Sequence, residues 1–435
     1  MKTHTNKSYS KEIILVLGGG FAGMNFAKHI DHKRYEVKVV DRNNFHSFPP
    51  LFYQVASSGL ETSDISFPFR REFKKLKNIT YHLGHVKNID LKNKTVTTSY
   101  ETIPYDKLVV ALGSTNNFFG MEGLDEEVFC IKTAAEASRT REEILDRLER
   151  ASIEPNPERR RQLLSFMIVG GGASGVEIAG ALGEMKRDII PLEYPELNPD
   201  ELSITLIEGG DSLLSAMGDK CSQKAYVYLQ KLLVDVRLNT HLTSYKDKMA
   251  SFADGHSEYW ETLIWTAGVK GESLPGFDEK AIGHAGRILT DEYCRVKGYE
   301  DSVFAIGDIA LMTTDDYPHG HPQLAQPALQ QGKLLAENLN LKPEKADKAK
   351  PFRYKDKGTM ATVGKHLAVA KIGNLTLGGG LAWLAWMFVH LVTIMGMRNK
   401  VSVLTNWIWN YFSYSTSLRI LQRPTKYPMR RHWGD

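Results

Sequence analysis

Two glycine-rich turns of the same G-x-G-x-x-G design lie about 150 residues apart. The spacing of the glycines within each turn suits the binding of a pyrophosphate. Each follows a short apolar strand, in IILVLGGGFAG and in SFMIVGGGASG. The first glycine of such a turn permits a tight bend, the second lets the backbone approach a pyrophosphate, and the third lets the next helix pack on the strand. The glycines are Gly18, Gly20 and Gly23 in the first turn, and Gly170, Gly172 and Gly175 in the second. The pair predicts two dinucleotide sites and electron transfer as the chemistry.

An acidic residue at the end of the next strand supports each site, because its carboxylate can accept hydrogen bonds from ribose hydroxyls. The strand YEVKVVDR supplies Asp41, followed by Arg42, and SITLIEGG supplies Glu208. The second interval is longer than usual and contains several prolines, so we expect an inserted loop there. Those prolines are Pro191, Pro195 and Pro199. The alternative interpretation is a glycine-rich turn that binds no ligand.

Three later strands also end in small residues or an acid. KLVVALGS ends in a turn containing Ala111 and Gly113, ETLIWTAGV in a turn containing Gly268, and DSVFAIGDIA in Gly307 and Asp308. An aspartate in that last position either caps a helix or holds the ribityl or pyrophosphate part of a flavin. The flavin interpretation implies that the first domain is discontinuous and that the second is inserted into it.

The elements that must position these residues form an α/β chain. We predict a strand over 12–17, a helix over 21–30 and a strand over 36–41, then an antiparallel meander over 78–98 and a charged helical stretch over 134–162. The expected fold has two Rossmann-like dinucleotide-binding domains and a C-terminal amphipathic helical region. The expected boundaries are 11–115 with 286–345 for a FAD-binding domain, 116–285 for an NAD(H)-binding domain, and 346–435 for membrane association.

The C-terminal region is apolar, aromatic and basic. Residues 377–397 and 401–418 contain no Lys, Arg, Asp or Glu. The first segment is long enough to span a bilayer, but its leading glycines and central His390 favour helices that lie in the membrane surface. A buried core or dimer helix is the third possibility. Seven basic residues follow position 397 against one acid, Asp435, which favours an anionic lipid surface over a solvated tail; they are Arg398, Lys400, Arg419, Arg423, Lys426, Arg430 and Arg431.

Composition bounds the remaining possibilities. The chain has 435 residues, 42% hydrophobic content and a net charge of +4, which suits two or three globular domains and gives no indication of nucleic-acid binding. Cys130, Cys221 and Cys294 form no C-x-x-C pair and are too few for a four-thiolate cluster. With no apolar secretion signal near the N-terminus, we expect the catalytic part to face the cytoplasm.

Taken together, these motifs resemble the type II, non-pumping NADH:quinone oxidoreductases, flavoproteins similar to the disulfide reductases but without the redox disulfide. The resemblance covers nearly the whole chain, and AQPALQQG followed by an apolar, aromatic C-terminus is its most specific part. The matching segments are DRNNFHSFPPLFYQVAS (41–57), ALGS (111–114), GGGASGVEIAG (170–180), LIEGGDSLL (206–214), IWTAGVK (264–270), VFAIGD (303–308) and AQPALQQG (325–332).

This resemblance implies bound FAD, NADH as the donor, a membrane quinone as the acceptor and a homodimer at the cytoplasmic face of the cell membrane. It also implies roles for three residues. Glu177 resembles the acid near the nicotinamide–flavin stack. Gln326 and Gln330 resemble the glutamines that frame the quinone headgroup, and Gln326 is also assigned to the FAD site. Lys400 is a candidate for a lysine near the quinone mouth, and proton delivery is left open between Glu177, His390 and water.

The choice of nucleotide follows from charge. Glu208 would repel a 2′-phosphate, and the glycines after it offer no arginine, so the sequence predicts NADH over NADPH. A sulfide:quinone oxidoreductase is the main alternative, and it would need thiols such as Cys130 and Cys294 against the flavin. A soluble ferredoxin or rubredoxin reductase and a non-catalytic nucleotide sensor are the further alternatives.

Overall fold

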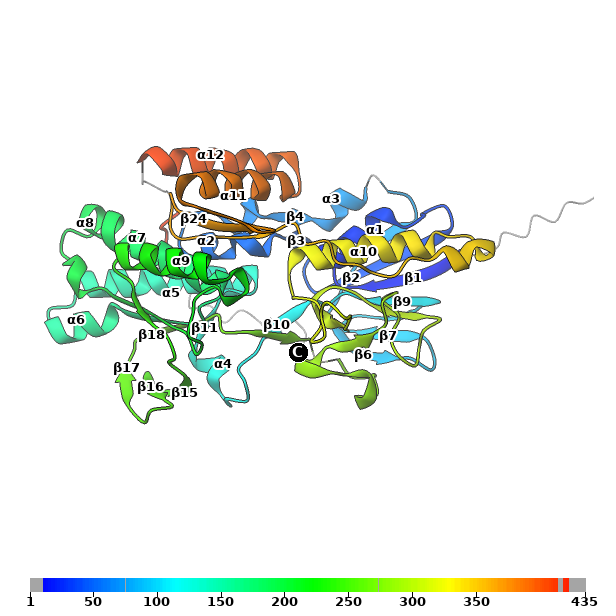
Figure 1. The fold of residues 1–435 in the computed structure, drawn as a ribbon, viewed down its shortest axis with the longest axis horizontal. Coiled ribbons are helices and arrows are strands. Elements are labelled where there is room, and N and C mark those ends of the chain that lie inside the picture. Colours follow the sequence, from blue (N-terminus) through cyan, green and yellow to red (C-terminus); the bar gives the residue numbers. More distant parts are fainter. Residues whose placement is uncertain (1–10, 75, 273, 414–417, 422–435) are drawn as a thin grey trace, which may run out of the picture.

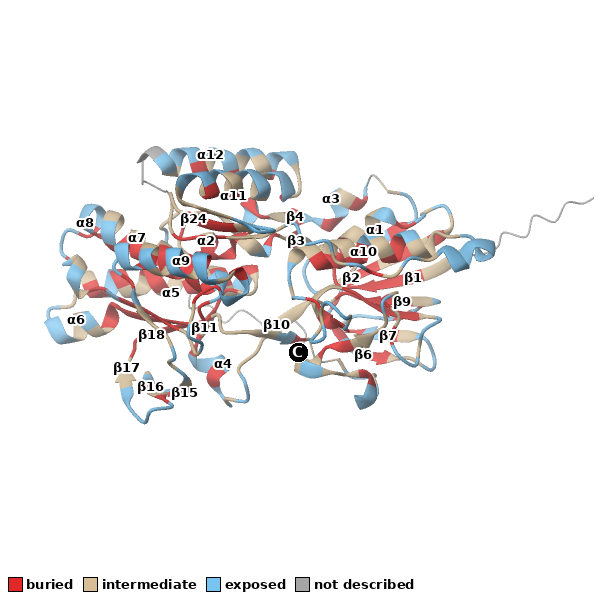
Figure 2. Cartoon of the chain, in the orientation of Figure 1, coloured by how far each residue is buried: buried red, intermediate tan, exposed pale blue. Residues whose placement is uncertain are grey.

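The computed structural model describes residues 11–74, 76–272, 274–413 and 418–421. Two five-stranded parallel sheets lie side by side, and a small C-terminal module covers them on one side (Figure 1). The strands of both sheets are mostly buried, whereas the outward sides of the C-terminal helices are exposed (Figure 2). The α/β fold with two Rossmann-like units and a C-terminal helical region is therefore as predicted.

The first sheet contains the first glycine turn, and layers cover both of its faces. Ile14 and Val16 of the central strand pack with α1 and α10, whereas Leu15 and Leu17 pack with an antiparallel meander. This double coverage explains why the strand is apolar at every position. The sheet order is β21 (Val303–Ala305), β9 (Lys107–Val110), β1 (Glu12–Leu17), β2 (Tyr35–Asp41) and β5 (Ile79–Leu83); the helices are α1 (Phe21–His29) and α10 (Ala325–Leu339); and the meander is β6 (Val86–Asp90), β7 (Thr95–Thr98) and β8 (Thr102–Pro104).

Two features of this sheet bear on the expectations from sequence. Its edge strand β21 pairs with β9, so the sheet is assembled from chain segments on either side of the second sheet. The predicted meander over 78–98 is wrong in its first part, because residues 79–83 extend the parallel sheet beside β2. The alternating pattern of that stretch fits either pairing, and only the long-range partner decides between them.

The second sheet contains the second glycine turn. Its order is β11 (Phe129–Cys130), β18 (Thr262–Trp265), β12 (Ser165–Val169), β13 (Ser203–Ile207) and β14 (Asp235–Arg237), and its helices are α5 (Ala134–Ser152), α6 (Pro157–Leu163), α7 (Ala173–Glu184), α8 (Ile190–Glu193) and α9 (Asp219–Lys231). The proline-containing interval after α7 begins with a π-helix, η3 (Met185–Ile189), and continues into α8, so it is partly helical rather than a loop. A small antiparallel sheet of β15 (Leu242–Lys246), β16 (Met249–Phe252) and β17 (Ser257–Tyr259) precedes β18.

An antiparallel ribbon connects the two units. β10 (Ser114–Asn116) leaves the first unit and pairs with β19 (Val269–Gly271), which returns from the second. The shorter elements around the units are β3 (Phe45–Ser47), β4 (Ser66–Pro68), β20 (Ile288–Thr290), β22 (Ala310–Met312), α2 (Phe52–Ala56), α3 (Phe69–Phe73), α4 (Leu124–Glu127) and the 3-10 helices η1 (Pro49–Leu51), η2 (Thr62–Asp64), η4 (Pro199–Glu201), η5 (Ser215–Met217), η6 (Glu279–Ala281), η7 (His284–Gly286), η8 (Gly307–Ile309) and η9 (Pro343–Lys348).

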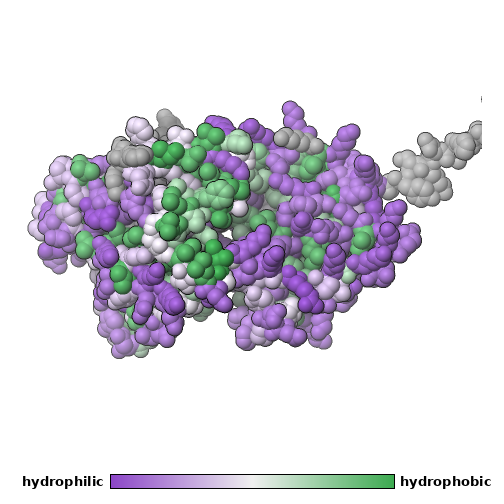
Figure 3. All heavy atoms as spheres, turned by 45° about the horizontal axis from the view of Figure 1, so that its top comes forward, coloured by the Kyte–Doolittle hydropathy of each residue, from purple (hydrophilic) through white to green (hydrophobic). Residues whose placement is uncertain are grey.

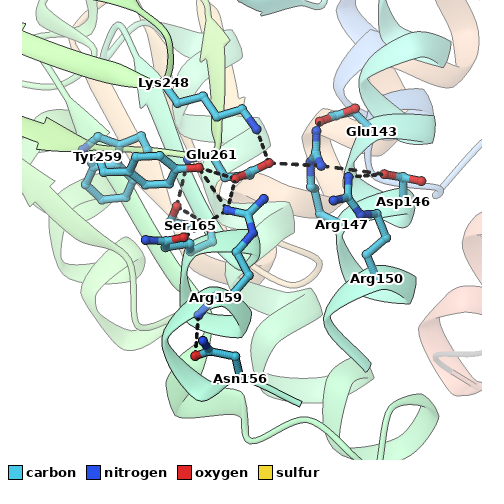
Figure 4. Close-up of polar contacts among 12 residues, drawn as sticks. Glu143, Asp146, Arg147, Arg150, Asn156, Arg159, Ser165, Lys248, Tyr259 and Glu261 are labelled. Carbon is cyan, nitrogen blue, oxygen red and sulfur yellow. Dashed lines mark hydrogen bonds and ion pairs between the residues drawn. The ribbon is translucent and has the colours of Figure 1, made fainter. Parts of the chain in front are cut away.

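A buried carboxylate stabilises the second unit at the N-terminal ends of its strands, which lie opposite the glycine turn. Glu261 precedes β18, its side chain is fully buried, and it receives Arg147 of α5 at 3.1 Å and Arg159 of α6 at 2.8 Å (Figure 4). Lys248 and Tyr259 also contact it. Burial raises the pKa of Glu261, but hydrogen bonds from Lys248, Tyr259 and Arg159 outweigh it and lower the pKa to about 2. The carboxylate therefore ties two helices and a small sheet to one strand.

The C-terminal module consists of a three-stranded antiparallel sheet and two helices. Its elements are β23 (Thr359–Thr362), β24 (Ala368–Ile372), β25 (Leu375–Gly378), α11 (Gly379–Thr393) and α12 (Met397–Ser413). One side of α11 packs on the sheet and buries Ala382 and Trp386. No helix in the described part of the chain is both long and apolar enough to cross a membrane. Four of the basic residues noted in the sequence, Arg423, Lys426, Arg430 and Arg431, lie outside the described residues.

Candidate functional site

The first glycine turn has the close contacts that its residue spacing predicts. Gly18 adopts a φ of +98°, and a Cβ there would lie 2.3 Å from the carbonyl oxygen of Ala111. A Cβ on Gly23 would lie 1.9 Å from the carbonyl oxygen of Gly18, so a side chain at either position would force the turn apart. Asp41 at the end of β2 accepts a hydrogen bond from the Gly19 N–H at 2.7 Å. Burial raises the pKa of Asp41, against the opposing effect of the N–H donors of Asn43 and Gly19.

The second turn repeats this construction. Gly170 has a φ of +109°, and a Cβ on Gly175 would lie 1.8 Å from the carbonyl oxygen of Gly170. Glu208 takes the place of the aspartate, because its two carboxylate oxygens accept from Gly171 N–H at 2.5 Å and Gly210 N–H at 2.7 Å. In each unit, the acid at the end of the second strand thus orients the glycine turn that follows the first strand.

A cavity of about 710 Å³ is lined by residues of the first glycine turn and of the second unit. A Cβ on Gly20 or Gly113 would meet no atom within 4 Å, so the backbone there borders open space. That space, at the N-terminal end of α1, fits a dinucleotide whose pyrophosphate needs close backbone approach and N–H donors. The predicted residues that line the cavity are Gly18, Gly20, Asp41, Arg42, Ala111, Gly113, Gly268 and Asp308; those that do not are Gly23, Gly170, Gly172, Gly175, Glu177, Glu208, Gln326 and Gln330.

Asp308 is one of the residues that line this cavity. Its Oδ2 accepts from the Ser114 hydroxyl at 2.6 Å, and Lys132 Nζ lies 3.8 Å away. The buried amide of Gln331 accepts from the preceding Gly307 N–H at 2.7 Å. Asp308 therefore lies where the first unit, the ribbon and the start of the second unit meet, and it is more than a helix cap.

Gln326 and Gln330 lie on one face of α10, as their spacing predicts, but their amides are already paired. Gln326 donates to Gly358 O at 2.8 Å and accepts from Lys357 N–H at 3.1 Å. Gln330 donates to Lys355 O at 2.9 Å and accepts from Lys355 N–H at 3.0 Å. The two glutamines thus hold the extended segment that leads into β23.

Glu177 lies on α7 where this helix meets the C-terminal module. It is 7% exposed, its Oε1 accepts from Thr362 N–H at 3.3 Å, and burial raises its pKa to about 8. Glu184 lies two turns later and accepts a hydrogen bond from Lys365 N–H. Burial raises the pKa of Glu184 to about 7. Between them, a Cβ on Gly180 would lie 2.7 Å from the Gly364 nitrogen, so the helix and the module are in close contact.

A chain of hydrogen bonds leads from the C-terminal helices to the residue beside Glu177. Trp407 Nε1 donates to Gln54 Oε1 at 2.8 Å, and Gln54 Nε2 donates to the Tyr53 hydroxyl at 2.9 Å. The Tyr53 and Thr362 hydroxyls are 2.8 Å apart. Because Tyr53 already accepts from Gln54, it is the natural donor to Thr362, and burial raises the pKa of its hydroxyl.

His390, a candidate for proton delivery, and Lys400, the candidate lysine of the quinone mouth, have different surroundings. His390 stacks on Trp386 with ring centroids 4.1 Å apart and meets Phe48 edge-on at 6.1 Å. Burial lowers the pKa of His390 to about 4, so its ring is neutral at pH 7. Lys400 is a hydrogen-bond donor to Val392 O near the end of α11, so it caps a helix there.

Several residues that shape the site were not identified from the sequence. Tyr53 and Gln331 lie in segments that match the family but were assigned no role, because aromatic and amide side chains become informative only when their partners are known. Glu184 did offer a signal, since an acid two turns after Glu177 lies on the same face of a helix that is otherwise apolar.

The cysteines are dispersed. Cys130 belongs to a core cluster of the second unit and Cys294 to the core of the first, and all three cysteines are free and buried. None of them lines the cavity between the glycine turns. Burial raises the pKa of Cys130 to about 12, which leaves it a thiol at neutral pH. The described residues contain no group of three or more His, Cys, Asp or Glu arranged to hold a metal ion.

Comparison with known proteins agrees with this architecture. The family model described as pyridine nucleotide-disulphide oxidoreductase matches residues 13–332, and that of the NDH2 C-terminal domain matches residues 357–413. The type II NADH:quinone oxidoreductase Ndh of Mycobacterium tuberculosis is 32% identical over 92% of this chain and 88% of its own.

Two solved structures share the fold. NDH2 from Plasmodium falciparum in complex with NADH has a TM-score of 0.86 at 21% identity, covering 95% of this chain and 100% of its own. The sulfide:quinone oxidoreductase of Aquifex aeolicus has a TM-score of 0.71 at 18% identity, covering 93% of this chain and 96% of its own. These low identities show the fold, whereas the sequence relatives show the family. The chain belongs to the type II NADH:quinone oxidoreductases, as its sequence motifs predicted, and not to the sulfide:quinone enzymes.

Proposed function

We propose that this chain oxidises NADH and reduces a membrane quinone by way of bound FAD, without moving ions across the membrane. The observation that carries the proposal is the cavity that runs from the first glycine turn to Ser174, Trp265 and Gly268 of the second unit, in a chain with a C-terminal module of the NDH2 type. We further propose that the FAD-binding domain comprises 11–115 and 286–345, the NAD(H)-binding domain 116–285 and the membrane region 346–435.

The first unit would hold FAD. Gly18, Gly20 and Gly23 shape the turn for the pyrophosphate. Asp41 and Arg42 lie at the end of the next strand, where the ribose would bind. Ala111, Gly113 and Asp308 also line the cavity, and Gln326 would act on this site from α10. When bound, FAD supplies a two-electron carrier that takes a hydride from NADH and passes two electrons to a quinone.

The second unit would hold NADH, at Gly170, Gly172, Gly175, Glu208 and Gly268. Glu208 is fixed by two backbone N–H donors, so its negative charge stays at the end of β13 where a 2′-phosphate would come. Glu177 follows this turn and would face the nicotinamide end. As a buried acid with a raised pKa, it is protonated at neutral pH and can donate a hydrogen bond or a proton there.

Gln326 and Gln330 would contribute to the quinone end of the reaction as positioning residues. Their amides fix the backbone of residues 355–358 through four hydrogen bonds, and this segment continues into the strand that contains Thr362. By holding this strand, they set where Thr362 meets Glu177 and Tyr53.

The membrane would be contacted by the outer faces of α11 and α12. Hydrophobic side chains gather over these helices, in contrast to the mostly hydrophilic surface around them (Figure 3). Leu381 and Met397 are each 75% exposed, and Phe388 is 69% exposed. Such an apolar surface, flanked by basic residues, suits helices that lie in one leaflet of an anionic membrane. We also propose that the enzyme lies at the cytoplasmic face of the membrane and forms a homodimer. Light scattering of the detergent-purified protein tests the oligomeric state.

Steady-state turnover tests the function. The holoenzyme purified in detergent is mixed with a short-chain quinone and with NADH, NADPH or sulfide as the donor. We expect rapid NADH oxidation, at least tenfold weaker kcat/KM with NADPH, and no turnover with sulfide. A Cys130→Ser, Cys221→Ser, Cys294→Ser triple variant should keep NADH activity, whereas its loss would favour a thiol mechanism.

A further inference from the structure

An exposed histidine lies beside the acid of the second glycine-turn unit. His241 follows β14 and precedes β15, and it is exposed. A Cβ on Gly209 would lie 2.7 Å from both Cε1 and Nδ1 of the His241 ring. Gly209 directly follows Glu208, so the imidazole of His241 lies against the same turn that holds the Glu208 carboxylate. A titratable ring therefore adjoins the acid that is assigned to the nucleotide ribose.

Backbone hydrogen bonds fix this placement. The two residues before His241 donate their N–H groups to Gly210 O at 2.8 Å and to Glu208 O at 2.9 Å, so the segment that leads into His241 is attached to the turn after β13. Gly209 does not adopt a left-handed backbone conformation. The imidazole, rather than backbone strain, therefore excludes a side chain at position 209.

The sheet order places His241 on the adenosine side of the nucleotide site. β13 and β14 lie on one side of β12, and β18, which leads to Gly268, lies on the other. Ligands of open parallel sheets bind at the carboxyl ends of the strands, and the acid of the second strand binds the 2′-hydroxyl of the adenosine ribose. His241 follows the carboxyl end of β14. It is therefore next to the place where NADH has a 2′-hydroxyl and NADPH has a 2′-phosphate.

The other charged groups on the elements around His241 are largely paired with one another. The turn between β16 and β17 contacts His241 through Ala253 N–H, which donates to His241 O at 3.0 Å. Ion pairs of 2.5–2.9 Å join the charged side chains of this turn and of β14 to their neighbours; they are Asp254 with His256, and Arg237 with Asp235 and with Glu258. On the turn after β13, Glu208 accepts two backbone N–H bonds and Asp211 is exposed. A proton gained by His241 therefore acts mainly on Glu208 and on a ligand beside it.

A cation at this position would change which nucleotide fits. A site for NADP provides a cation for the 2′-phosphate, where a site for NAD provides an acid for the 2′-hydroxyl. Imidazole is the side chain that changes its charge between pH 5 and pH 8. With His241 neutral, Glu208 sets the local charge and repels a 2′-phosphate. With His241 protonated, a positive charge lies beside Glu208 and offsets that repulsion.

We propose that His241 is a second specificity-determining residue of the nucleotide site, and that its protonation admits the 2′-phosphate of NADPH. The inference rests on the proposed function, since it refines the choice of donor at the same site. It goes beyond the role of Glu208, because the preference for NADH then depends on pH. The preference is strongest when His241 is neutral, and it narrows as the pH falls.

The test measures nucleotide preference against pH. The kcat/KM for NADPH is divided by that for NADH, with the holoenzyme and a short-chain quinone, at pH 8 and at pH 5.5. A phosphate monoester itself titrates at about pH 6, but it does so in every variant, so His241→Gln gives the baseline. Between pH 8 and pH 5.5 we expect the ratio to rise about fivefold more in wild type than in His241→Gln, the effect of one exposed charge pair at about 4 Å. His241→Lys, which is charged at both pH values, should have the higher ratio at both.

A binding measurement gives the same comparison without turnover. Isothermal titration of adenosine 2′,5′-bisphosphate into the oxidised holoenzyme should show the same additional gain in affinity at pH 5.5 in wild type over His241→Gln. His256→Gln, which changes an exposed imidazole on the neighbouring turn, is the matched control and should behave as wild type.

A pH dependence in His241→Gln equal to that of wild type overturns the assignment, and so does a His241→Lys ratio equal to that of His241→Gln. A wild-type enzyme that oxidises no NADH with quinone would instead refute the proposed function, so the two failures are distinguishable.

Discussion

At the scale of single residues, Glu177 shows how the fold sets the chemistry of a side chain. On an exposed helix face it would be an ordinary charged residue, but packing against β23 buries it with one backbone donor, and its pKa rises to about 8. The sequence predicted a functional acid at this position through its resemblance to a family. It gave no sign of the burial, because the covering strand lies almost two hundred residues later.

This burial predicts a pH-dependent stability. A carboxyl whose pKa is higher in the folded than in the unfolded chain stabilises fully below about pH 4.5, and that contribution is lost as pH rises through about 8. Glu177→Gln cannot ionise, so its thermal midpoint relative to wild type should increase from pH 5 to pH 8. Circular dichroism melting of the holoenzyme measures this difference. The exposed Glu126→Gln is the control, and an equal offset at both pH values would contradict the buried, protonated state.

Glu208 makes a prediction about nucleotide choice. Glu208→Gln removes the negative charge that would repel a 2′-phosphate, so we expect the NADH preference in kcat/KM to fall at least tenfold. The exposed neighbour Asp211→Asn should keep the wild-type preference. An unchanged ratio in Glu208→Gln would mean that the second site lies elsewhere.

At the scale of elements, the two strand–turn–helix units have nearly the same geometry but are assigned different ligands. Their design could be predicted from sequence because it is local: the glycine spacing fixes a close contact within six residues in each case. Pairings that span long chain segments could not. The alternating pattern of residues 78–98 predicts a meander, yet β5 extends the parallel sheet, and no sequence pattern indicated that the amides of Gln326 and Gln330 hold residues 355–358.

Matched glycine substitutions separate the two sites. In Gly23→Ala a Cβ would lie 1.9 Å from Gly18 O, and in Gly175→Ala 1.8 Å from Gly170 O. We expect Gly23→Ala to be purified with little flavin, and Gly175→Ala to keep its flavin but show at least a tenfold higher KM for NADH. Gly380→Ala, where a Cβ meets no atom within 4 Å, is the control. Flavin loss in Gly175→Ala with an intact Gly23→Ala would reverse the assignment.

The Glu261 network predicts how the second unit responds to acid and to mutation. Its lowered pKa means that its stabilisation is present above about pH 4.5 and is lost as pH falls towards 2. Glu261→Gln removes the charge that Arg147, Arg159 and Lys248 share, although Arg147 keeps its pair with Glu143, and we expect a cost on the order of 3 kcal/mol. Urea unfolding, followed by tryptophan fluorescence, measures this change in the free energy of unfolding. Glu258→Gln, which breaks a more exposed pair with Arg237, should cost about 1 kcal/mol or less, and equal costs would contradict the account.

At the scale of the whole molecule, the C-terminal module connects the nucleotide units to an apolar surface. The lack of charged residues over 377–397 and 401–418 is evident from the sequence. The sequence does not indicate which side of α11 is buried. Trp386 is 1% exposed while Leu381 is 75% exposed on the same helix, and only the packing on β24 distinguishes them.

The proposed membrane attachment would rest on this surface, and a double variant tests it. The double variant Leu381→Glu and Phe388→Glu should no longer sediment with vesicles of phosphatidylcholine and phosphatidylglycerol, because two charges would have to enter an apolar layer. NADH reduction of a soluble dye should persist. Ile153→Glu, at an 81% exposed apolar position on the second unit, should still sediment. Binding that survives the double variant would place the membrane contact on another face.

The order of electron flow is the central claim, and one anaerobic spectroscopic titration tests it most directly. NADH added to the oxidised holoenzyme should bleach the flavin absorbance, and a short-chain quinone added next should restore it in full, whereas sulfide should have no effect. A flavin bleached by sulfide, or one that stays bleached when quinone is added, would contradict the account.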